Sequence, residues 1–204
     1  MKLENRIYLA SRSPRRRELL GQIGVRFDLL LFRSGDRADP ETDETPLPGE
    51  VPEDYVVRVA RAKAHHGASL LNCRNLPDRP VLSADTTLDL GGEIIGKPND
   101  AADACAILGR LSGKTHRVLT AVAVAAGQRT EHVLSISDVR FRELDEREIR
   151  AYVASGEPMD KAGAYGLQGR AAIFVSEVRG SPSGIVGLPL CETALLLRGF
   201  GLTP

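Results

Sequence analysis

The stretch IYLASRSPRRRELLGQIG, residues 7–24, decides how the chain begins to fold. Residues 7–10 read as a short strand, and the apolar spacing over residues 18–23 predicts a helix that stops at Gly24. Ser13 is a good N-cap for this helix, and Pro14 suits its first position. A strand that passes directly into a helix is the unit from which α/β folds are built.

Arg15, Arg16 and Arg17 fill the first turn of this predicted helix. That end of a helix already carries the positive pole of the dipole, so each cation there costs about 0.3–1 kcal/mol. Either the side chains extend into water, or they bind an anion together with the free backbone N–H groups. Phosphate fits the second reading, with Ser11 as a further hydrogen-bond donor. The spacing alone favours neither.

Strand and helix patterns alternate along the 204 residues, which predicts an α/β fold in one domain, residues 1–204, long enough to form two lobes. Residues 33–54 are polar and acidic and contain proline, as expected for a mobile loop. The other expected strands are 27–31, 81–84, a hairpin over 87–95, 117–125, 133–141 and 171–178. The other expected helices are 52–71, 102–111, 145–156 and 189–199.

The composition restricts the class of protein. Lys+Arg and Asp+Glu number 27 each and aromatic residues make up 4%, so a basic site for nucleic acid can only be local. The three cysteines lack CxxC spacing and a nearby histidine, which argues against disulfides or zinc and fits a reducing cytoplasm. The first residues lack a long apolar run, so we expect neither a signal peptide nor a membrane span.

Lys63 lies in the middle of the apolar face of the predicted helix 52–71, alongside Tyr55, Val56, Val59 and Ala60. A lysine on an inward face either extends its ammonium to solvent or meets a negative partner, because an unpaired buried ammonium is costly. Both readings stay open, and a second phosphate contact would explain this lysine and the arginine turn together.

Asp85 ends an apolar run, where an aspartate can hold a metal, act as a base or simply begin a turn. In open α/β sheets ligands bind at the carboxyl ends of strands. A hairpin turn at Gly91 and Gly92 pairs Leu88 with Ile95 and Thr86 with Lys97, which brings Lys97 near Asp85. A regular ladder puts those two side chains on opposite faces, so the contact requires a bulge or bend.

Two glycine-containing stretches could each bind a ligand, and the sequence favours different interpretations of them. GRLSGKT, residues 109–115, resembles a phosphate-binding loop, but its spacing is one residue short and it follows a helix, so we read it as a turn. DKAGAYGLQGR, residues 160–170, is a flexible connection or a loop whose glycines let a flat ligand approach. In the second case Gln168 can donate to and accept from a base edge.

Several stretches together resemble the Maf family of nucleoside triphosphate pyrophosphatases, namely LASRSPRRRELL, YVVRVARAKA, SADTTLDLGGEIIGKP, LSGKTHRVLTAVAV, EPMDKAGAYGLQG and GIVGLPL. They follow one another in the family order over nearly the whole chain. The stretch DKAGAYGLQG is similar to the branch that acts on dTTP and UTP, and differs from the branch that prefers 7-methyl-GTP.

The resemblance implies an elongated α/β fold of the Maf and ITPase-like kind, with a mixed sheet, flanking helices and two lobes around a central cleft. It also implies a homodimer that releases pyrophosphate from dTTP and UTP with a divalent cation, Mg²⁺ or Mn²⁺. Family members are associated with removal of non-standard nucleotides and with arrest of septum formation.

The resemblance also assigns roles by motif position. Asp85 is the expected base and a metal ligand, and Asp36 is the expected second metal ligand. The residues expected to hold the triphosphate are Ser11, Arg15, Lys63 and Lys97. Those expected to select the pyrimidine are Arg16, Thr86 and Gln168.

Two departures from the family pattern affect these roles. Many relatives carry glutamate where this chain has Ala62, and Asp36 is shorter than the glutamate common at its position. The alternatives are the same reaction on a modified nucleotide, and a nucleic-acid-binding module that uses the arginines of residues 12–17.

Overall fold

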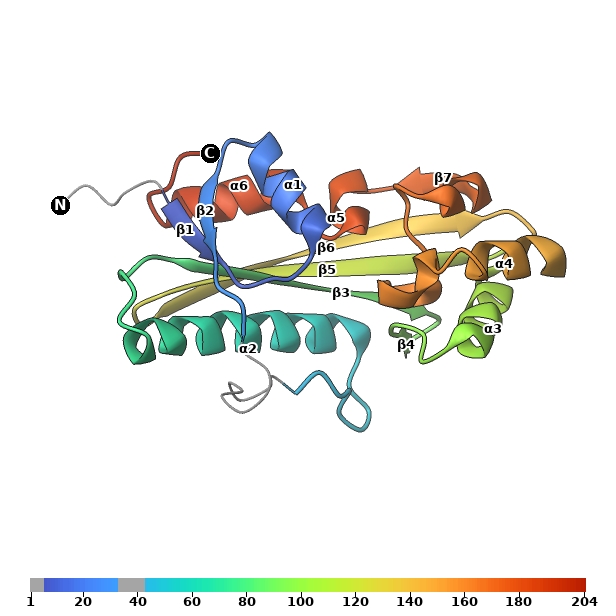
Figure 1. The fold of residues 1–204 in the computed structure, drawn as a ribbon, viewed down its shortest axis with the longest axis horizontal. Helices are drawn as coiled ribbons and strands as arrows, with labels where there is room; N and C mark the ends of the chain where they lie inside the picture. The colour runs from blue at the N-terminus through green and yellow to red at the C-terminus, as the bar shows by residue number, and fades with distance from the viewer. Residues whose placement is uncertain (1–5, 33–42) are drawn as a thin grey trace.

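One mixed β-sheet runs through the molecule, and helices cover both of its faces (Figure 1). The computed structural model of the protein describes residues 6–32 and 43–204. The strands are β1 (Arg6–Leu9), β2 (Arg26–Leu29), β3 (Val81–Leu90), β4 (Glu93–Ile95), β5 (Thr115–Ala126), β6 (Arg129–Phe141) and β7 (Val175–Arg179).

The helices begin and end close to the positions expected from their caps. The α-helices are α1 (Pro14–Gln22), α2 (Pro52–Cys73), α3 (Ala101–Leu111), α4 (Glu146–Val153), α5 (Pro182–Val186) and α6 (Leu190–Gly199). The short 3₁₀ helices are η1 (Glu157–Asp160), η2 (Ala162–Ala164) and η3 (Arg170–Phe174). Within the described ranges, none of the helices combines the length and the apolar character needed to cross a bilayer.

Over the described residues the sheet has seven strands, with the order β2-β1-β3-β5-β6-β7 and with β4 paired to β3. Strand β1 runs parallel to β2 and β3, and all other neighbouring strands are antiparallel. This confirms the predicted α/β class and its mixed sheet. The long strands β3, β5 and β6 run along most of the elongated molecule, with α2 on one side and α1, α5 and α6 on the other (Figure 1).

The sequence prediction divided β3 wrongly into a strand over 81–84 and a separate hairpin. The structure has one strand from Val81 to Leu90, because pairing with β5 continues unbroken from Val81 to Asp89. Asp85 and Thr86 are polar and read as a break, yet both belong to this ladder. The hairpin itself is confirmed, since Leu88 pairs with Ile95 and Leu90 with Glu93.

The predicted strand over 171–178 is also partly wrong. Residues 170–174 form the 3₁₀ helix η3, and β7 begins only at Val175. Strand β7 runs antiparallel to β6 and Val175 pairs with Phe141, the last residue of β6, so residues before Val175 have no strand beside them. In the stretch over 109–115, the first three residues end α3 and Thr115 begins β5, so the predicted turn is confirmed for residues 112–114.

Separate apolar clusters fill the two ends of the molecule. One lies beside α3 and α4 and includes Leu88, Leu108 and Phe141. A second lies beneath α1 and α6 and includes Leu9, Leu20, Leu82 and Leu197. The shared strands β3 and β5 connect the two ends, and this arrangement agrees with the two-lobed fold class that the family resemblance implied.

A buried histidine on β5 joins the sheet to the glycine-rich loop, residues 160–170. The Nε2 atom of His116 on β5 lies 2.8 Å from the Tyr165 hydroxyl, and both rings pack against Phe141. His116 is 2% exposed and burial lowers its pKa to about 4, so the imidazole is neutral in the folded protein at pH 7. The contact between His116 and Tyr165 holds the first residue of the segment 165–169 in place.

We expect Gly67→Ala in α2 to lower the free energy of unfolding by about 1 kcal/mol, although alanine favours helices by a similar amount. A Cβ atom at Gly67 lies only 2.8 Å from Cγ1 of Val81, a β-branched side chain with little freedom to move. Gly109→Ala in α3 is the matched control, because a Cβ there meets nothing within 4 Å. Urea unfolding of the control should show a gain of about 0.5–1 kcal/mol; equal shifts in both variants contradict the prediction.

We expect the stability of the protein to fall as the pH drops from about 6.5 to 4, partly through His116. The unfolded chain takes up a proton near pH 6.5, whereas burial holds the folded-state pKa at about 4, so protonation favours unfolding in this window. Relative to His116→Gln, the wild type should lose roughly 3 kcal/mol more between pH 7 and 4. The exposed His65 provides the control variant His65→Gln, which should keep the wild-type slope. Identical slopes for His116→Gln and the wild type disprove the assignment.

Candidate active site

A cavity of about 1560 Å³ opens beside the middle of β3. Its walls come from the start of α1, from α2, from residues 94–99 after the hairpin, and from residues 157–169 and 185–187. All the described residues for which the sequence predicted a binding or catalytic role contribute to this lining: Ser11, Arg15, Arg16, Lys63, Asp85, Thr86, Lys97 and Gln168.

The cavity lies where β3 lacks a neighbouring strand. Strand β1 pairs with β3 only as far as Leu82, and β4 begins to pair at Leu88. Among the described strands, none covers this edge of β3 from Ser83 to Thr87. Successive side chains of a strand point to opposite faces, so both faces of β3 can reach one cavity at this gap.

Asp85 therefore does not lie at the carboxyl end of a strand, as the sequence analysis assumed. It lies in mid-strand opposite Ala121 of β5, at the uncovered edge, and it is 8% exposed. The physical reason is that β1 ends early. Beyond the end of β1, the backbone and side chains of β3 are accessible from the side. A ligand can therefore reach β3 in mid-strand.

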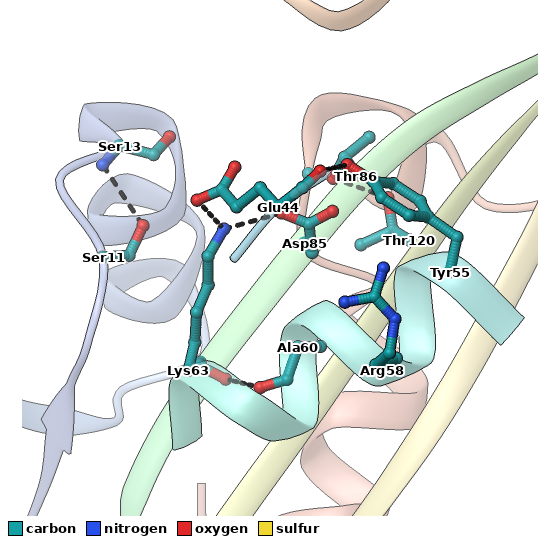
Figure 2. A network of polar contacts seen from close by, with 12 residues as sticks. Ser11, Ser13, Glu44, Tyr55, Arg58, Ala60, Lys63, Asp85, Thr86 and Thr120 are labelled. Atoms are coloured by element: carbon teal, nitrogen blue, oxygen red, sulfur yellow. Dashed lines mark hydrogen bonds and ion pairs between the residues drawn. The ribbon is translucent and has the colours of Figure 1, made fainter. Parts of the chain in front are cut away.

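Lys63 meets two carboxylates (Figure 2). Its Nζ atom lies 2.8 Å from Oδ1 of Asp85 and 2.8 Å from Oε1 of Glu44, and the Lys63 side chain is 15% exposed. Of the two readings of this lysine, the negative partner is confirmed. The contact joins α2 to β3 and orients the Asp85 carboxylate within the cavity.

Glu44 was missed by the sequence analysis, which assigned the second carboxylate to Asp36. Asp36 lies outside the described residues. Glu44 belongs to a segment held on α2, where Tyr55 donates from its hydroxyl to the Glu44 carbonyl oxygen at 2.9 Å. Burial and the nearby negative charges of Asp85 and Glu44 raise the pKa of Tyr55 to about 12, so this donor keeps its proton.

Arg58 anchors the same segment. Its Nε atom lies 2.6 Å from Glu50, and its NH2 group donates to the Thr45 carbonyl oxygen at 3.0 Å. The hydrogen bond from Arg58 lowers the pKa of Glu50 to about 2. The density of acidic residues just before α2 was visible in the sequence, but a partner for Lys63 could be identified only from tertiary contacts.

The three arginines of α1 have three different environments. Ser13 caps the helix by accepting from the Arg16 backbone N–H, as predicted. Arg17 is exposed, whereas Arg15 lies on the cavity wall and its NH2 group is 3.6 Å from Asp160 of the opposite lobe. The anion reading therefore suits Arg15, and the solvated reading suits Arg17.

The guanidinium of Arg16 is turned toward protein groups. Its Nε donates to the Gly187 carbonyl oxygen at 2.8 Å, NH1 to Ser11 Oγ at 3.3 Å and NH2 to Thr86 Oγ1 at 3.2 Å. Burial lowers its pKa from the usual value of 12.5. Its donors hold α1 against β3 and the segment before α6, so Arg16 shapes the cavity wall.

Lys97 reaches the cavity by a route other than the predicted ladder. The β3–β4 pairing stops at Ile95, so Thr86 and Lys97 are not paired and no bulge is needed. Beyond Ile95 the chain leaves the sheet, and the Gly96 carbonyl oxygen accepts from the Gly163 N–H at 2.8 Å. This departure brings Lys97 and the glycine-rich loop to the same side of the cavity.

The glycine-rich loop packs tightly around the side chains of Glu157 and Lys161. Glu157 accepts hydrogen bonds from the Tyr152 hydroxyl and the Arg170 N–H, both at 3.1 Å. A Cβ atom at Gly169 would lie 1.8 Å from Glu157 Oε1, and one at Gly166 would lie 2.7 Å from Lys161 Cε. A side chain at Gly169 would displace the Glu157 carboxylate from these hydrogen bonds, whereas at Gly166 the flexible end of Lys161 can move aside.

Comparisons with known proteins identify the family. The family described as "Maf-like protein" matches residues 6–200. The curated dTTP/UTP pyrophosphatase of Dechloromonas aromatica strain RCB is 67% identical over 199 residues, which is 98% of this chain and 99% of the relative. The dTTP/UTP pyrophosphatase of Aromatoleum aromaticum is 66% identical over 98% of this chain and 97% of its own.

A further relative, the dTTP/UTP pyrophosphatase of Cupriavidus pinatubonensis, is 59% identical over 94% of this chain and 95% of its own. Among solved structures, the Ham1 protein of Staphylococcus aureus superposes with a TM-score of 0.47 at 16% identity, over 67% of this chain and 71% of that chain. So distant a likeness adds nothing to the family assignment. The match to the family over residues 6–200 and the near full-length relatives show that the chain belongs to the Maf family.

Proposed function

We propose that this protein hydrolyses dTTP and UTP to the nucleoside monophosphate and pyrophosphate. The observation that carries the proposal is the meeting, in one cavity, of a buried carboxylate on β3 with cations from separate segments of the chain. Relatives named dTTP/UTP pyrophosphatase over nearly their whole length support the choice of substrate.

The cations of the cavity wall suit a triphosphate. Arg15 comes from α1, Lys63 from α2 and Lys97 from the segment after β4, so their charges approach from different directions. Positive groups placed in advance around a leaving pyrophosphate stabilise the charge that develops on it. Ser11 and the start of α1 provide neutral donors beside them.

Asp85 is the base in this proposal. Its carboxylate takes a proton from a water molecule whose oxygen forms a bond to the α-phosphorus, while the bond from that phosphorus to the bridging oxygen of the β-phosphate breaks. The electron pair of the broken bond leaves on pyrophosphate, and the protein forms no covalent bond. The contact of Asp85 with Lys63 keeps the carboxylate in place.

The divalent cation of this proposal would be held by two carboxylates. Within residues 6–32 and 43–204, no group of three or more His, Cys, Asp or Glu side chains is arranged to hold a metal. Asp85 and Glu44 share Lys63, so we propose that they hold Mg²⁺ or Mn²⁺ together with substrate phosphates, as Mg²⁺ sites with few protein ligands do. The cation, when bound, neutralises phosphate charge and polarises the attacked phosphorus.

The homodimer, the removal of non-standard nucleotides and the link to septum formation stay predictions from the family resemblance, and the cytoplasmic location stays a prediction from the cysteines. The remaining reading, a nucleic-acid-binding module, gains no support from the arginines. Arg16 is committed to contacts within the protein, and Arg12 donates to the Phe32 carbonyl oxygen at 2.8 Å.

Pyrophosphate release from a panel of nucleoside triphosphates tests the substrate class. With Mg²⁺ or Mn²⁺ we expect kcat/KM for dTTP and UTP to exceed that for CTP, GTP and ATP, and EDTA to abolish release.

Gln168→Ala should flatten this preference among nucleotides, because the amide can pair with a base edge. Faster turnover of modified or purine nucleotides would favour the alternative substrate, and an unchanged profile for Gln168→Ala rules out its base contact.

Replacing the proposed base separates chemistry from binding. Asp85→Asn should lower kcat on dTTP by at least about a hundredfold, the usual contribution of a general base, while the variant still binds α,β-methylene-dTTP in calorimetry without added metal. Glu44→Gln is the matched comparison, because it removes the other carboxylate that contacts Lys63.

Glu44→Gln should retain turnover but require more Mg²⁺ for half-maximal activity. Unchanged turnover in Asp85→Asn removes Asp85 from its role. An unchanged Mg²⁺ requirement in Glu44→Gln removes Glu44 from the metal site.

A further inference from the structure

A chain of hydrogen bonds runs behind the cavity wall on the face of β3 opposite Lys63. Arg16 NH2 lies 3.2 Å from Thr86 Oγ1, which lies 2.9 Å from Thr120 Oγ1, and Thr120 Oγ1 lies 2.8 Å from the Gly184 carbonyl oxygen. Thr86 and Thr120 are opposite each other on β3 and β5 (Figure 2). Thr120 is 1% exposed, so it cannot exchange these partners for solvent.

The two ends of the chain fix the direction of every hydrogen bond in it. A carbonyl oxygen only accepts, so the single hydroxyl proton of Thr120 goes to Gly184. Thr120 therefore accepts from Thr86, which uses the single proton of Thr86. At the other end a guanidinium only donates, so Thr86 accepts from Arg16.

Thr86 Oγ1 has one lone pair left after these two contacts, and Thr86 lines the cavity. Toward a bound molecule it is an acceptor only, because its proton is already held by Thr120. A ligand group that meets Thr86 must donate a hydrogen bond. A ligand acceptor at that point would leave two acceptors facing each other, which is costly in a partly buried site.

We infer that Thr120 is a positioning residue for base selection: by holding the Thr86 proton it makes Thr86 an acceptor that favours the keto pyrimidines. This inference rests on the proposed function, and on the base rather than a phosphate meeting Thr86, because ionised phosphate oxygens only accept hydrogen bonds and an acceptor at Thr86 offers them nothing. Uracil and thymine carry one N–H donor on their pairing edge, at N3, between two carbonyl oxygens. In cytosine N3 is an acceptor. A fixed acceptor at Thr86 thus accepts uracil and thymine and disfavours cytosine in the same position.

The test compares Thr120→Val, which removes the hydroxyl from a nearly isosteric side chain, with Thr120→Ser, which keeps it. Dissociation constants are measured by calorimetry for α,β-methylene-UTP and α,β-methylene-CTP with Mg²⁺, and kcat/KM for UTP and CTP. In Thr120→Val the Thr86 hydroxyl is free to turn and donate to cytosine N3. The preference for uracil in binding and in kcat/KM should fall by about tenfold, the size expected for one mispaired hydrogen bond.

Thr120→Ser should keep the wild-type preference. If Thr120→Val does not purify as a folded protein, Thr120→Ala removes the same hydroxyl without adding bulk and carries the same expectation. The ratio between the two nucleotides is the decisive readout, because a purely structural role of Thr120 weakens both equally.

An equal loss for both nucleotides, an unchanged ratio, or a wild type without preference for uracil in binding overturns the inference. A loss of preference in Thr120→Val and Thr120→Ser alike also overturns it. A wild type that prefers the UTP analogue but releases no pyrophosphate contradicts the proposed function and leaves the inference standing, since binding alone then reports the effect of Thr120→Val.

Discussion

The ion pair between Lys63 and Asp85 constrains the rest of the site. An ammonium with 15% of its side chain exposed is stable only with a negative partner, and the 2.8 Å contacts with Asp85 and Glu44 provide two. The pair connects the inward face of α2 to the uncovered edge of β3. It thereby sets the position of the carboxylate to which we assign the chemistry, and of the segment before α2 that carries Glu44.

The uncovered edge exists because the sheet changes from parallel to antiparallel pairing along one side of β3. Strand β1 stops at Leu9, opposite Leu82, and β4 starts pairing at Leu88. Between them, neighbouring residues of one strand face opposite sides of the sheet and still border the same cavity. Asp85 faces α2 with its cationic partner, and Thr86 faces α1 and α5 with its hydrogen-bond chain. One strand thus supplies both a reactive group and a recognition group.

A second layer of polar contacts holds the cavity wall in one arrangement. Glu157 accepts a hydrogen bond from the Arg170 N–H at the end of the glycine-rich loop. The contact between His116 and Tyr165 connects the middle of that loop to β5. Arg16 ties α1 to Gly187 and Thr86. Hydrogen bonds between buried polar groups leave the cavity wall few alternative conformations, which suits a site that must distinguish similar bases.

Local chemistry in the sequence determined the features that depend on neighbouring residues. Ser13 and Pro14 begin α1, Asp145 and Glu148 form a capping box, and Gly91 and Gly92 set the register of the hairpin. Each follows from short-range hydrogen bonding or backbone geometry. Tertiary structure alone decided that β3 continues through Asp85, that Glu44 meets Lys63, and that Thr86, Thr120 and Gly184 align. Those features join residues far apart in the chain, and no local pattern encodes the distances that packing of α2, α5 and the sheet imposes.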